Sequence, residues 1–321
     1  MTPMSSEPTE EHRRVSRRHF IGTGGAAVVA FALCSGRVAG AARGDVGFAF
    51  GLVADPQYCD CPVRRTRHYR ASLDKLAEAA RTFNGDDLSF TAQVGDIIDR
   101  HEASFDDILP VFERVRGPKH HVLGNHDFPI PAEEVVARLG MPDRYYHFRR
   151  EGWRFIVLDT SDVSLHANPP GSEKYELAEA ILADLERRGA VNAKAFNGAV
   201  GDEQLAWLRH TLAGAARRDE KVVVLSHMPV HPAGLHNAWN DEAVVEALEA
   251  HGNVVAYFNG HNHQGDYGER DGIHYVTLRG MVELDTNAYA IVRVRPGRLE
   301  IEGYGREPDR VLEFAAGRVA A

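Results

Sequence analysis

Residues 47–57 read Gly-Phe-Ala-Phe-Gly-Leu-Val-Ala-Asp-Pro-Gln, an apolar run that ends in two metal-type ligands, Asp55 and Gln57. Four other apolar runs of the chain end in the same way. Neighbouring strands of a sheet bring such ends to one edge, so we expect all five clusters to meet at a single site. The four further clusters are Gly95-Asp96-Ile-Ile-Asp99, Gly124-Asn125-His126-Asp127, Ser226-His227 and Gly260-His261-Asn262-His263.

The wider pattern alternates strands with helices and ends in consecutive strands, which favours α/β layers followed by antiparallel pairing. Both features fit two mixed β-sheets packed as a sandwich flanked by helices, a four-layer αββα arrangement. Besides the run at 47–53, the expected strands are 88–94, 120–123, 145–158 with a turn at 151–152, 221–225, 254–258, 273–278, 288–294 and 299–304. The expected helices are 66–82, 105–116, 131–139, 173–188, 202–217 and 241–251.

The first 41 residues differ in character from the rest. Ser16-Arg17-Arg18-His19-Phe20-Ile21 precedes an uncharged stretch at 22–36 and small residues at 39–41, which resembles a twin-arginine export signal cleaved after Ala41. The stretch is short and rich in Gly and Ala for a membrane anchor, and Leu33 before Cys34 argues against a lipoprotein site. We therefore expect a periplasmic or secreted protein that uses the twin-arginine export machinery and keeps no stable membrane anchor.

Charge and cysteine content limit the partners. The chain of 321 residues has a formal charge of −9, and loss of residues 1–41, with five arginines and three glutamates, leaves −11. This acidic balance argues against binding to a nucleic-acid polymer. Residues 42–321 are expected to form a single catalytic domain. Pairing of Cys59 with Cys61 and two unpaired thiols stay open as alternatives, and the sequence gives no oligomeric state.

The five clusters offer carboxylate, carboxamide and imidazole donors and no thiolate. Oxygen and nitrogen donors of this kind favour Mn²⁺, Fe, Zn²⁺ or Mg²⁺ over copper or an iron–sulfur cluster. Two divalent metals would lower the pKa of a shared water and supply hydroxide as the nucleophile for a phosphate-containing small molecule. With two ligand carboxylates, such a site is locally positive inside an acidic protein.

The ordered motifs D-x-(H/Q), GDxxD, GNH(D/E), H and GHxH resemble the calcineurin-like metallophosphoesterases. That resemblance implies a metal site built from Asp55, Gln57, Asp96 and His263, and a second built from Asp96, Asn125, His227 and His261. It also gives His126 the role of general acid toward the leaving oxygen, with Asp127 orienting its imidazole.

Gln57 is a departure, because the more common form of the family has His at this position. A carboxamide oxygen is a harder donor than imidazole, which shifts the first site toward Mn²⁺ or Mg²⁺. The same substitution occurs in the manganese-dependent ADP-ribose/CDP-alcohol diphosphatases, and further stretches are similar to that group. These stretches are residues 51–58, 67–70, 196–198, 204–207, 238–240 and 303–310. The loop after Tyr58 is shorter than in that group, and Asp127 replaces Glu, which leaves base selectivity open.

Other polar residues near the motifs have plainer interpretations. Asp99 is expected to hold a loop by hydrogen bonds, and Asp159 and Asp162 to cap a turn. Surface or supporting positions are expected for four single histidines, His120, His121, His231 and His236.

Three residues are candidate substrate contacts. Arg67 and Arg70 could grip the phosphate that does not react, with a solvated basic face as the alternative. Phe196 could stack on a base, with core packing as its alternative.

The function expected first is hydrolysis of the diphosphate linkage of nucleoside diphosphate derivatives such as ADP-ribose or CDP-alcohols. The alternatives are a broader phosphodiesterase or phosphomonoesterase of the same superfamily and, with less support, a metal-binding protein without catalysis.

Overall fold

The computed structural model describes residues 47–314, so the expected export signal at residues 1–41 lies outside the described residues. Twelve strands of this part of the chain form two six-stranded sheets. The first has the order β12-β11-β10-β1-β2-β3 and the second β4-β5-β6-β7-β9-β8. The first sheet comprises β1 (Phe48–Val53), β2 (Phe90–Val94), β3 (Lys119–Val122), β10 (Ala288–Arg295), β11 (Arg298–Gly305) and β12 (Arg310–Glu313). The second comprises β4 (Tyr146–Arg150), β5 (Trp153–Val157), β6 (Lys221–Leu225), β7 (Val254–Asn259), β8 (Asp266–Arg270) and β9 (Ile273–Thr277).

Both sheets are mixed, as the sequence predicts. Strands β1, β2 and β3 are parallel in the first sheet, and β5, β6, β7 and β9 are parallel in the second. Strands β10, β11 and β12 extend the first sheet in antiparallel fashion, while β4 and β8 form antiparallel edges of the second. The carboxyl ends of the parallel strands therefore gather on one side of each sheet.

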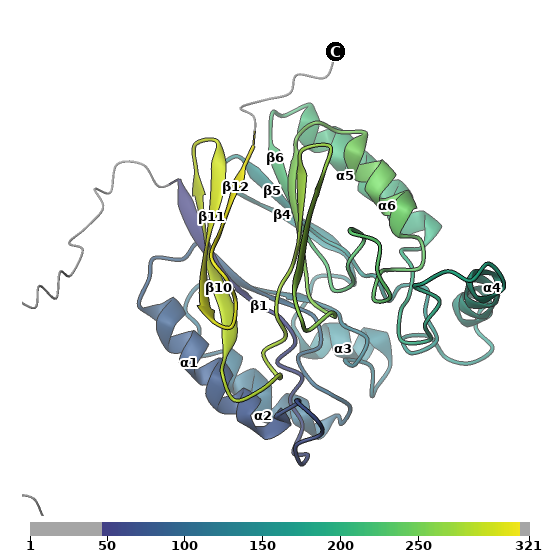
Figure 1. Ribbon diagram of the computed structural model, residues 1–321, viewed down its shortest axis with the longest axis horizontal. Coiled ribbons are helices and arrows are strands. Elements are labelled where there is room, and N and C mark those ends of the chain that lie inside the picture. The colour runs from purple at the N-terminus through teal and green to yellow at the C-terminus, as the bar shows by residue number, and fades with distance from the viewer. Residues whose placement is uncertain (1–46, 315–321) are drawn as a thin grey trace, which may run out of the picture. The chain divides into compact units, whose positions relative to one another are not determined.

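The two sheets pack face to face (Figure 1). An aromatic core lies between them. Phe50 and Phe90 stack with ring centroids 4.9 Å apart, and Phe155 of the opposite sheet meets Phe90 edge to face at 4.8 Å. All three side chains are fully buried. Such rings add contact energy beyond the area they bury, so this core fixes one sheet against the other.

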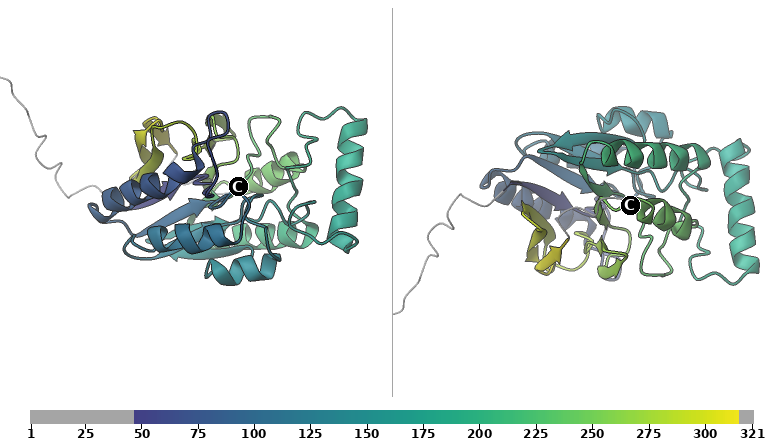
Figure 2. Two further views of the ribbon diagram at one scale, coloured as in Figure 1. Left: turned by 90° about the horizontal axis from the view of Figure 1, so that it is seen from below. Right: turned by 90° about the horizontal axis from the view of Figure 1, so that it is seen from above.

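Helices cover the outer faces of the sandwich (Figure 1). The first sheet packs against α1 (Ser72–Asn84), α2 (Ala103–Phe112) and α3 (Ala132–Arg138), whose apolar residues share one cluster with its strands. The second packs against α5 (Asp202–Ala216) and α6 (Asp241–Glu249). Helix α4 (Glu173–Arg187) projects away from both sheets (Figure 2). The expected four-layer αββα arrangement is confirmed.

The largest differences from the expected elements are one late helix start and two additional strands. The helix predicted at 66–82 begins only at Ser72, after a short 3-10 turn at Tyr69–Ala71, because the backbone of residues 66–68 pairs with residues 282–284. Strands β8 and β12 were not predicted, since both are short or polar edge strands with weak alternation.

Within residues 47–314, none of the helices combines the length and apolar character needed to cross a bilayer.

Candidate metal centre

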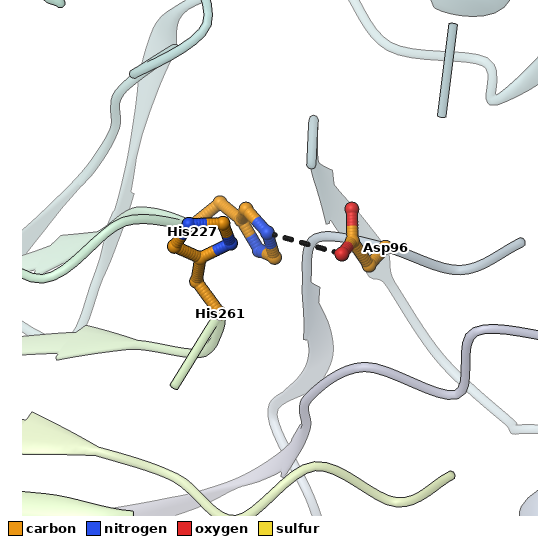
Figure 3. Close-up of side chains that lie close together, drawn as sticks. All are labelled: Asp96, His227 and His261. Carbon is orange, nitrogen blue, oxygen red and sulfur yellow. Dashed lines mark ion pairs between the residues drawn. The ribbon is translucent and has the colours of Figure 1, made fainter. Parts of the chain in front are cut away.

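The five sequence clusters meet where the carboxyl ends of β1, β2 and β3 face those of β6 and β7. Asp96, His227 and His261 offer ligand atoms that all lie within 4.8 Å of one another (Figure 3). Asp55, Asp96 and His263 form a second group by the same measure. The two groups share Asp96, so its carboxylate is positioned to contact two cations. The two groups contain the aspartates and histidines of the two ligand sets that the family resemblance implies.

The two carboxamides complete the seven predicted donors. The Asn125 oxygen Oδ1 lies 3.1 Å from Nε2 of His227, and Nε2 of Gln57 lies 3.5 Å from Oδ2 of Asp96. The other amide atom of Gln57, Oε1, is buried and has no hydrogen-bond partner among the described residues. A buried acceptor without a donor costs free energy unless a cation or water satisfies it. The residues present therefore fit a pair of divalent metals with oxygen and nitrogen ligands.

Backbone conformation also marks the ligands. Asp55, Gln57, Asp96 and His261 have φ values of 48°, 44°, 53° and 66°. These are four of the nine non-glycine residues with positive φ in the described part of the chain. The left-handed region is costly for such residues and persists where the surroundings enforce it, typically at functional sites. The strand ends turn sharply there, and the turns aim the side chains at one another.

Two motif glycines permit close approach between opposite loops. A Cβ atom added to Gly260 would lie 2.4 Å from Oδ2 of Asp55, and one added to Gly95 would lie 2.1 Å from Nδ1 of His227. Gly95 also has a φ of 97°, which other residues rarely adopt. The glycine of each motif is thus required because a ligand from another strand occupies the space of its missing side chain.

Each candidate histidine ligand has one ring nitrogen held by a protein acceptor. Nδ1 of His227 lies 3.0 Å from the carbonyl oxygen of Val94. Nε2 of His261 lies 2.9 Å from Oδ1 of Asn197, and Nδ1 of His263 lies 2.8 Å from Oε1 of Glu283. Such contacts fix the ring orientation and the tautomer, which leaves the other nitrogen to bind a metal.

The electrostatics of the cluster are those of a site that attracts cations. Burial acts to raise the pKa of Asp96, but His227 and His126 outweigh it and hold that pKa well below its usual range. Burial opposes protonation of His227 and His263, yet the neighbouring carboxylates raise the pKa of each to about 9. A divalent cation would take the place of these protons, so metal binding and proton release are linked at this site.

The structure corrects the role expected of Asp127. Its buried carboxylate accepts hydrogen bonds from the backbone N–H groups of Gly124, Asp96 and Ile98 at 2.8, 3.0 and 3.3 Å. The ring of His126 is held instead by Asp99, whose carbonyl oxygen lies 2.7 Å from Nδ1. Asp127 therefore braces the metal-binding loops against each other, and the expectation that it orients His126 is wrong.

The His126 side chain keeps 31% of its surface exposed, whereas that of Asp99 is buried. With Nδ1 held by the Asp99 carbonyl, Nε2 is left to face a bound substrate. The contact to His126 comes from the backbone carbonyl of Asp99, whereas its carboxylate pairs with the neighbouring Arg100, so the expected loop-holding role of that carboxylate stays a prediction.

The two arginines expected to contact substrate differ in position. Arg67 lines a cleft of about 400 Å³ together with Arg64, Arg65, Thr66, Tyr69 and Glu283. Its Nε lies 3.5 Å from Oε1 of Glu283. Arg70 forms an exposed pair with Asp60, at 2.5 Å. The cleft therefore adjoins the metal site through Glu283, and Arg67 is the better placed of the two.

Phe196 lies beside His261, a ligand of the second predicted metal site. Its side chain is 40% exposed, and its ring centroid lies 5.6 Å from that of His261 and 5.7 Å from that of His236. The exposure contradicts the alternative of core packing. An accessible aromatic ring beside a metal ligand is suited to stack on a planar group.

The remaining polar residues behave as supporting groups. Asp159 accepts from the N–H of Ser161 at 2.8 Å, pairs with Arg144 and so caps a turn, as expected. Asp162 accepts instead from the N–H of the distant Gly201 at 3.1 Å, so it ties this loop to the start of α5. His120 stacks on Phe148 away from the metal ligands.

The cysteine pair is a disulfide. Cys59 and Cys61 are joined, and Cys59 is fully buried beside Tyr69 and Val282.

Two supporting residues, Asn197 and Glu283, lie outside the five ligand motifs. Asn197 lies within the stretch Phe196-Asn-Gly198, which the sequence marks only by its resemblance to a family. Glu283 is a single carboxylate after β9 and carries no motif. Their partners are 64 and 20 residues away along the chain, so no local signal identifies them.

The strand ends of the two facing sheets hold a shared carboxylate and paired histidines. This arrangement defines a dinuclear metallohydrolase. The sequence profile described as calcineurin-like phosphoesterase matches residues 48–265. The chain belongs to the calcineurin-like phosphoesterase family and is a metal-dependent hydrolase.

Relatives and a solved structure extend the similarity over most of the chain. A human protein named manganese-dependent ADP-ribose/CDP-alcohol diphosphatase is 30% identical, over 84% of this chain and 94% of its own length. A protein of the same name from Oryza sativa subsp. japonica is 32% identical, over 83% and 94%. The crystal structure of a dimetal phosphatase from Danio rerio has a TM-score of 0.78 at 29% identity, covering 84% of this chain and all of the other.

The close approach at Gly260 gives a first prediction. A Gly260→Ala variant should lose most of its metal affinity, because its Cβ would displace the Asp55 carboxylate from the position it holds. Gly214→Ala on α5 is the matched control, since its nearest neighbour would lie 3.8 Å away. Titration with Mn²⁺ measures both, and wild-type affinity in Gly260→Ala would contradict the assigned position of Asp55.

Proposed function

We propose that this protein is a manganese-dependent phosphohydrolase that cleaves the diphosphate linkage of nucleoside diphosphate derivatives such as ADP-ribose and CDP-alcohols. The observation that carries the proposal concerns Gln57. Its side chain lies beside the shared carboxylate of Asp96, and its buried Oε1 has no hydrogen-bond partner among the described residues. A carboxamide at this position favours Mn²⁺ or Mg²⁺ over softer metals. The relatives that carry the diphosphatase name align over most of both chains.

The proposed ligands are those that meet in the structure. One metal would be held by Asp55, Gln57, Asp96 and His263, and the other by Asp96, Asn125, His227 and His261. When bound, the two metals supply Lewis-acid activation of a water and of the phosphate oxygens. By holding the metals, the carboxylates and imidazoles would fix where the phosphate binds, and the buried setting would strengthen these electrostatic contacts.

The flanks of the site fit a substrate with two different ends. The arginine-lined cleft beside Glu283 offers positive charge to a phosphate or phosphorylated sugar. Phe196, beside His261, offers a ring to a base. A substrate that contacted both groups would bring its diphosphate linkage to the metal site. A broader phosphodiesterase would need neither flank, which makes the flanks the test of substrate class.

The direct experiment is a substrate panel with purified protein and Mn²⁺, read by product chromatography. Hydrolysis of ADP-ribose to AMP and ribose 5-phosphate, several-fold faster than that of bis-p-nitrophenyl phosphate, supports a diphosphatase. The reverse order supports the broader phosphodiesterase. No hydrolysis beyond that of the Asp96→Ala control would support a metal-binding protein without catalysis.

His126 should matter more for poor leaving groups than for good ones. Its Nδ1 is held by Asp99, so Nε2 is free to deliver a proton to the leaving oxygen. A phosphate monoester leaves readily, whereas an alkoxide needs the proton, and general acid catalysis contributes about 100- to 10,000-fold where it is needed. His126→Ala should therefore lower kcat/KM more on alkyl phosphodiesters than on ADP-ribose. Equal losses would refute this role, and exposed His210 on α5 provides the control substitution.

Phe196 should influence the choice of base. Phe196→Ala is expected to change the ratio of kcat/KM for adenine- and cytosine-containing substrates by several-fold, because stacking strength depends on the base. Tyr267→Ala is a control at an aromatic ring that is 42% exposed on β8. An unchanged ratio in Phe196→Ala would remove this residue from the substrate site.

Export by the twin-arginine route is a further part of the proposal, supported by the sequence of residues 1–41. Folding before translocation would let the site take up manganese before zinc and copper compete for it. A reporter fused to residues 1–41 should reach the periplasm, and the substitutions Arg17→Lys and Arg18→Lys together should block it. Export that survives both substitutions would contradict the route.

A further inference from the structure

Glu283 contacts a candidate metal ligand without being one of the predicted donors. It follows β9, and only 6% of the residue is exposed. Its Oε1 accepts a hydrogen bond from Nδ1 of His263 at 2.8 Å and lies 3.5 Å from Nε of Arg67. One carboxylate therefore contacts both the metal site and the arginine-lined cleft.

The hydrogen bond decides which ring atom of His263 faces the first metal site. With Nδ1 donating to Glu283, Nε2 points toward Asp55 and lies 3.3 Å from its Oδ1. Rotating the ring by half a turn would place a carbon where Nε2 now lies. It would also leave the Glu283 carboxylate without its imidazole donor, which costs free energy in a buried position.

Shape alone does not select this orientation. The ring of His263 packs against Gly280, where an added Cβ would lie 2.7 Å from its Cγ, so the ring's location is fixed by the backbone. An imidazole has nearly the same outline in both ring orientations, and its hydrogen bonds distinguish them. Glu283 is the acceptor that makes this distinction at His263.

The segment that carries Glu283 is tied to the loop that carries Asp55. The N–H of Met281 donates to the carbonyl of Ala54 at 2.9 Å, and the N–H of Val282 donates to that of Asp55 at 3.0 Å. The buried ammonium of Lys75 donates to the Met281 and Glu283 carbonyls at 2.8 and 3.2 Å. Asp55 and the acceptor of His263 are thus held in one rigid frame.

We propose that Glu283 is a positioning residue that holds His263 with Nε2 directed into the first metal site. The inference rests on the proposed function only in that this site binds a divalent metal. The inference also adds detail to that function. Glu283 contacts both Arg67 of the cleft and His263 of the first metal site, so it links the cleft to that site and not to the second.

The test is the Mn²⁺ affinity of the two sites in Glu283→Ala and Glu283→Gln, measured by titration calorimetry and by electron paramagnetic resonance. Loss of a supporting acceptor typically lowers metal affinity about 10- to 100-fold. We expect a loss of this size at the first site in Glu283→Ala and a smaller loss there in Glu283→Gln. The affinity of the second site should stay within about threefold of wild type in both variants. At limiting Mn²⁺, the spectrum should change from coupled ions to a single ion.

Two control variants separate positioning from other effects. Glu220 is 8% exposed and pairs with Arg154 at 2.6 Å, but it precedes β6, at the end of that strand far from His227. Glu220→Ala should lower the Tm and leave both Mn²⁺ affinities unchanged. Arg67→Met should leave the Glu283 to His263 contact, and so both affinities, intact while raising the KM for substrate.

Three outcomes would overturn the inference. The first is wild-type Mn²⁺ affinity at both sites in both Glu283 variants. The second is an equal loss of Mn²⁺ affinity at the two sites, in proportion to a fall in Tm. The third is a loss of Mn²⁺ affinity in Arg67→Met as large as that in Glu283→Ala. A wild-type chain that binds fewer than two ions would overturn the proposed function as well. Two bound ions without hydrolysis of any diphosphate would overturn the proposed function alone.

Discussion

The site depends on two aspartates that are almost fully buried, Asp55 and Asp96, whose carboxylates come from adjacent parallel strands. Burial of a carboxylate is costly unless positive charge or strong donors compensate it. Three histidines surround these carboxylates, at distances of 3.3 Å for the ion pairs of His227 and His263. A pair of divalent cations provides the charge that this arrangement requires.

The architecture serves this constraint. Two sheets are needed because each contributes carboxyl ends of parallel strands, with aspartates from β1 and β2 and histidines from β6 and β7. Glycines at the motif turns let the opposing loops approach, and the aromatic core fixes the sheets against one another. A carboxylate without a metal role, Asp127, then ties the second and third loops together through three backbone N–H groups.

The ligands and the central strands could be predicted because their signals are local. Each ligand follows an apolar run within a few residues, and the turn glycines mark where the run ends. What failed depended on tertiary contacts. The helix expected from residue 66 starts late because the backbone of Arg67 and His68 pairs with distant residues 282–284, an interaction that outweighs helix propensity.

The supporting residues of the site lie beyond the reach of sequence patterns for a related reason. A carboxylate in a loop can point to several partners, and the backbone decides which one it meets. Asp127 meets three N–H donors and not the ring of His126, while Glu283, from an unmarked segment, meets His263. Edge strands β8 and β12 were missed because polar, half-exposed strands lack the alternation that marks buried ones.

The proposed chemistry requires two metal ions that share Asp96 at the junction of the two sheets. Anomalous diffraction from crystals grown with Mn²⁺ would locate such ions. We expect two peaks in each chain, one bounded by Asp55, Gln57, Asp96 and His263 and the other by Asp96, Asn125, His227 and His261. A single peak, or two peaks that do not share Asp96, would contradict it.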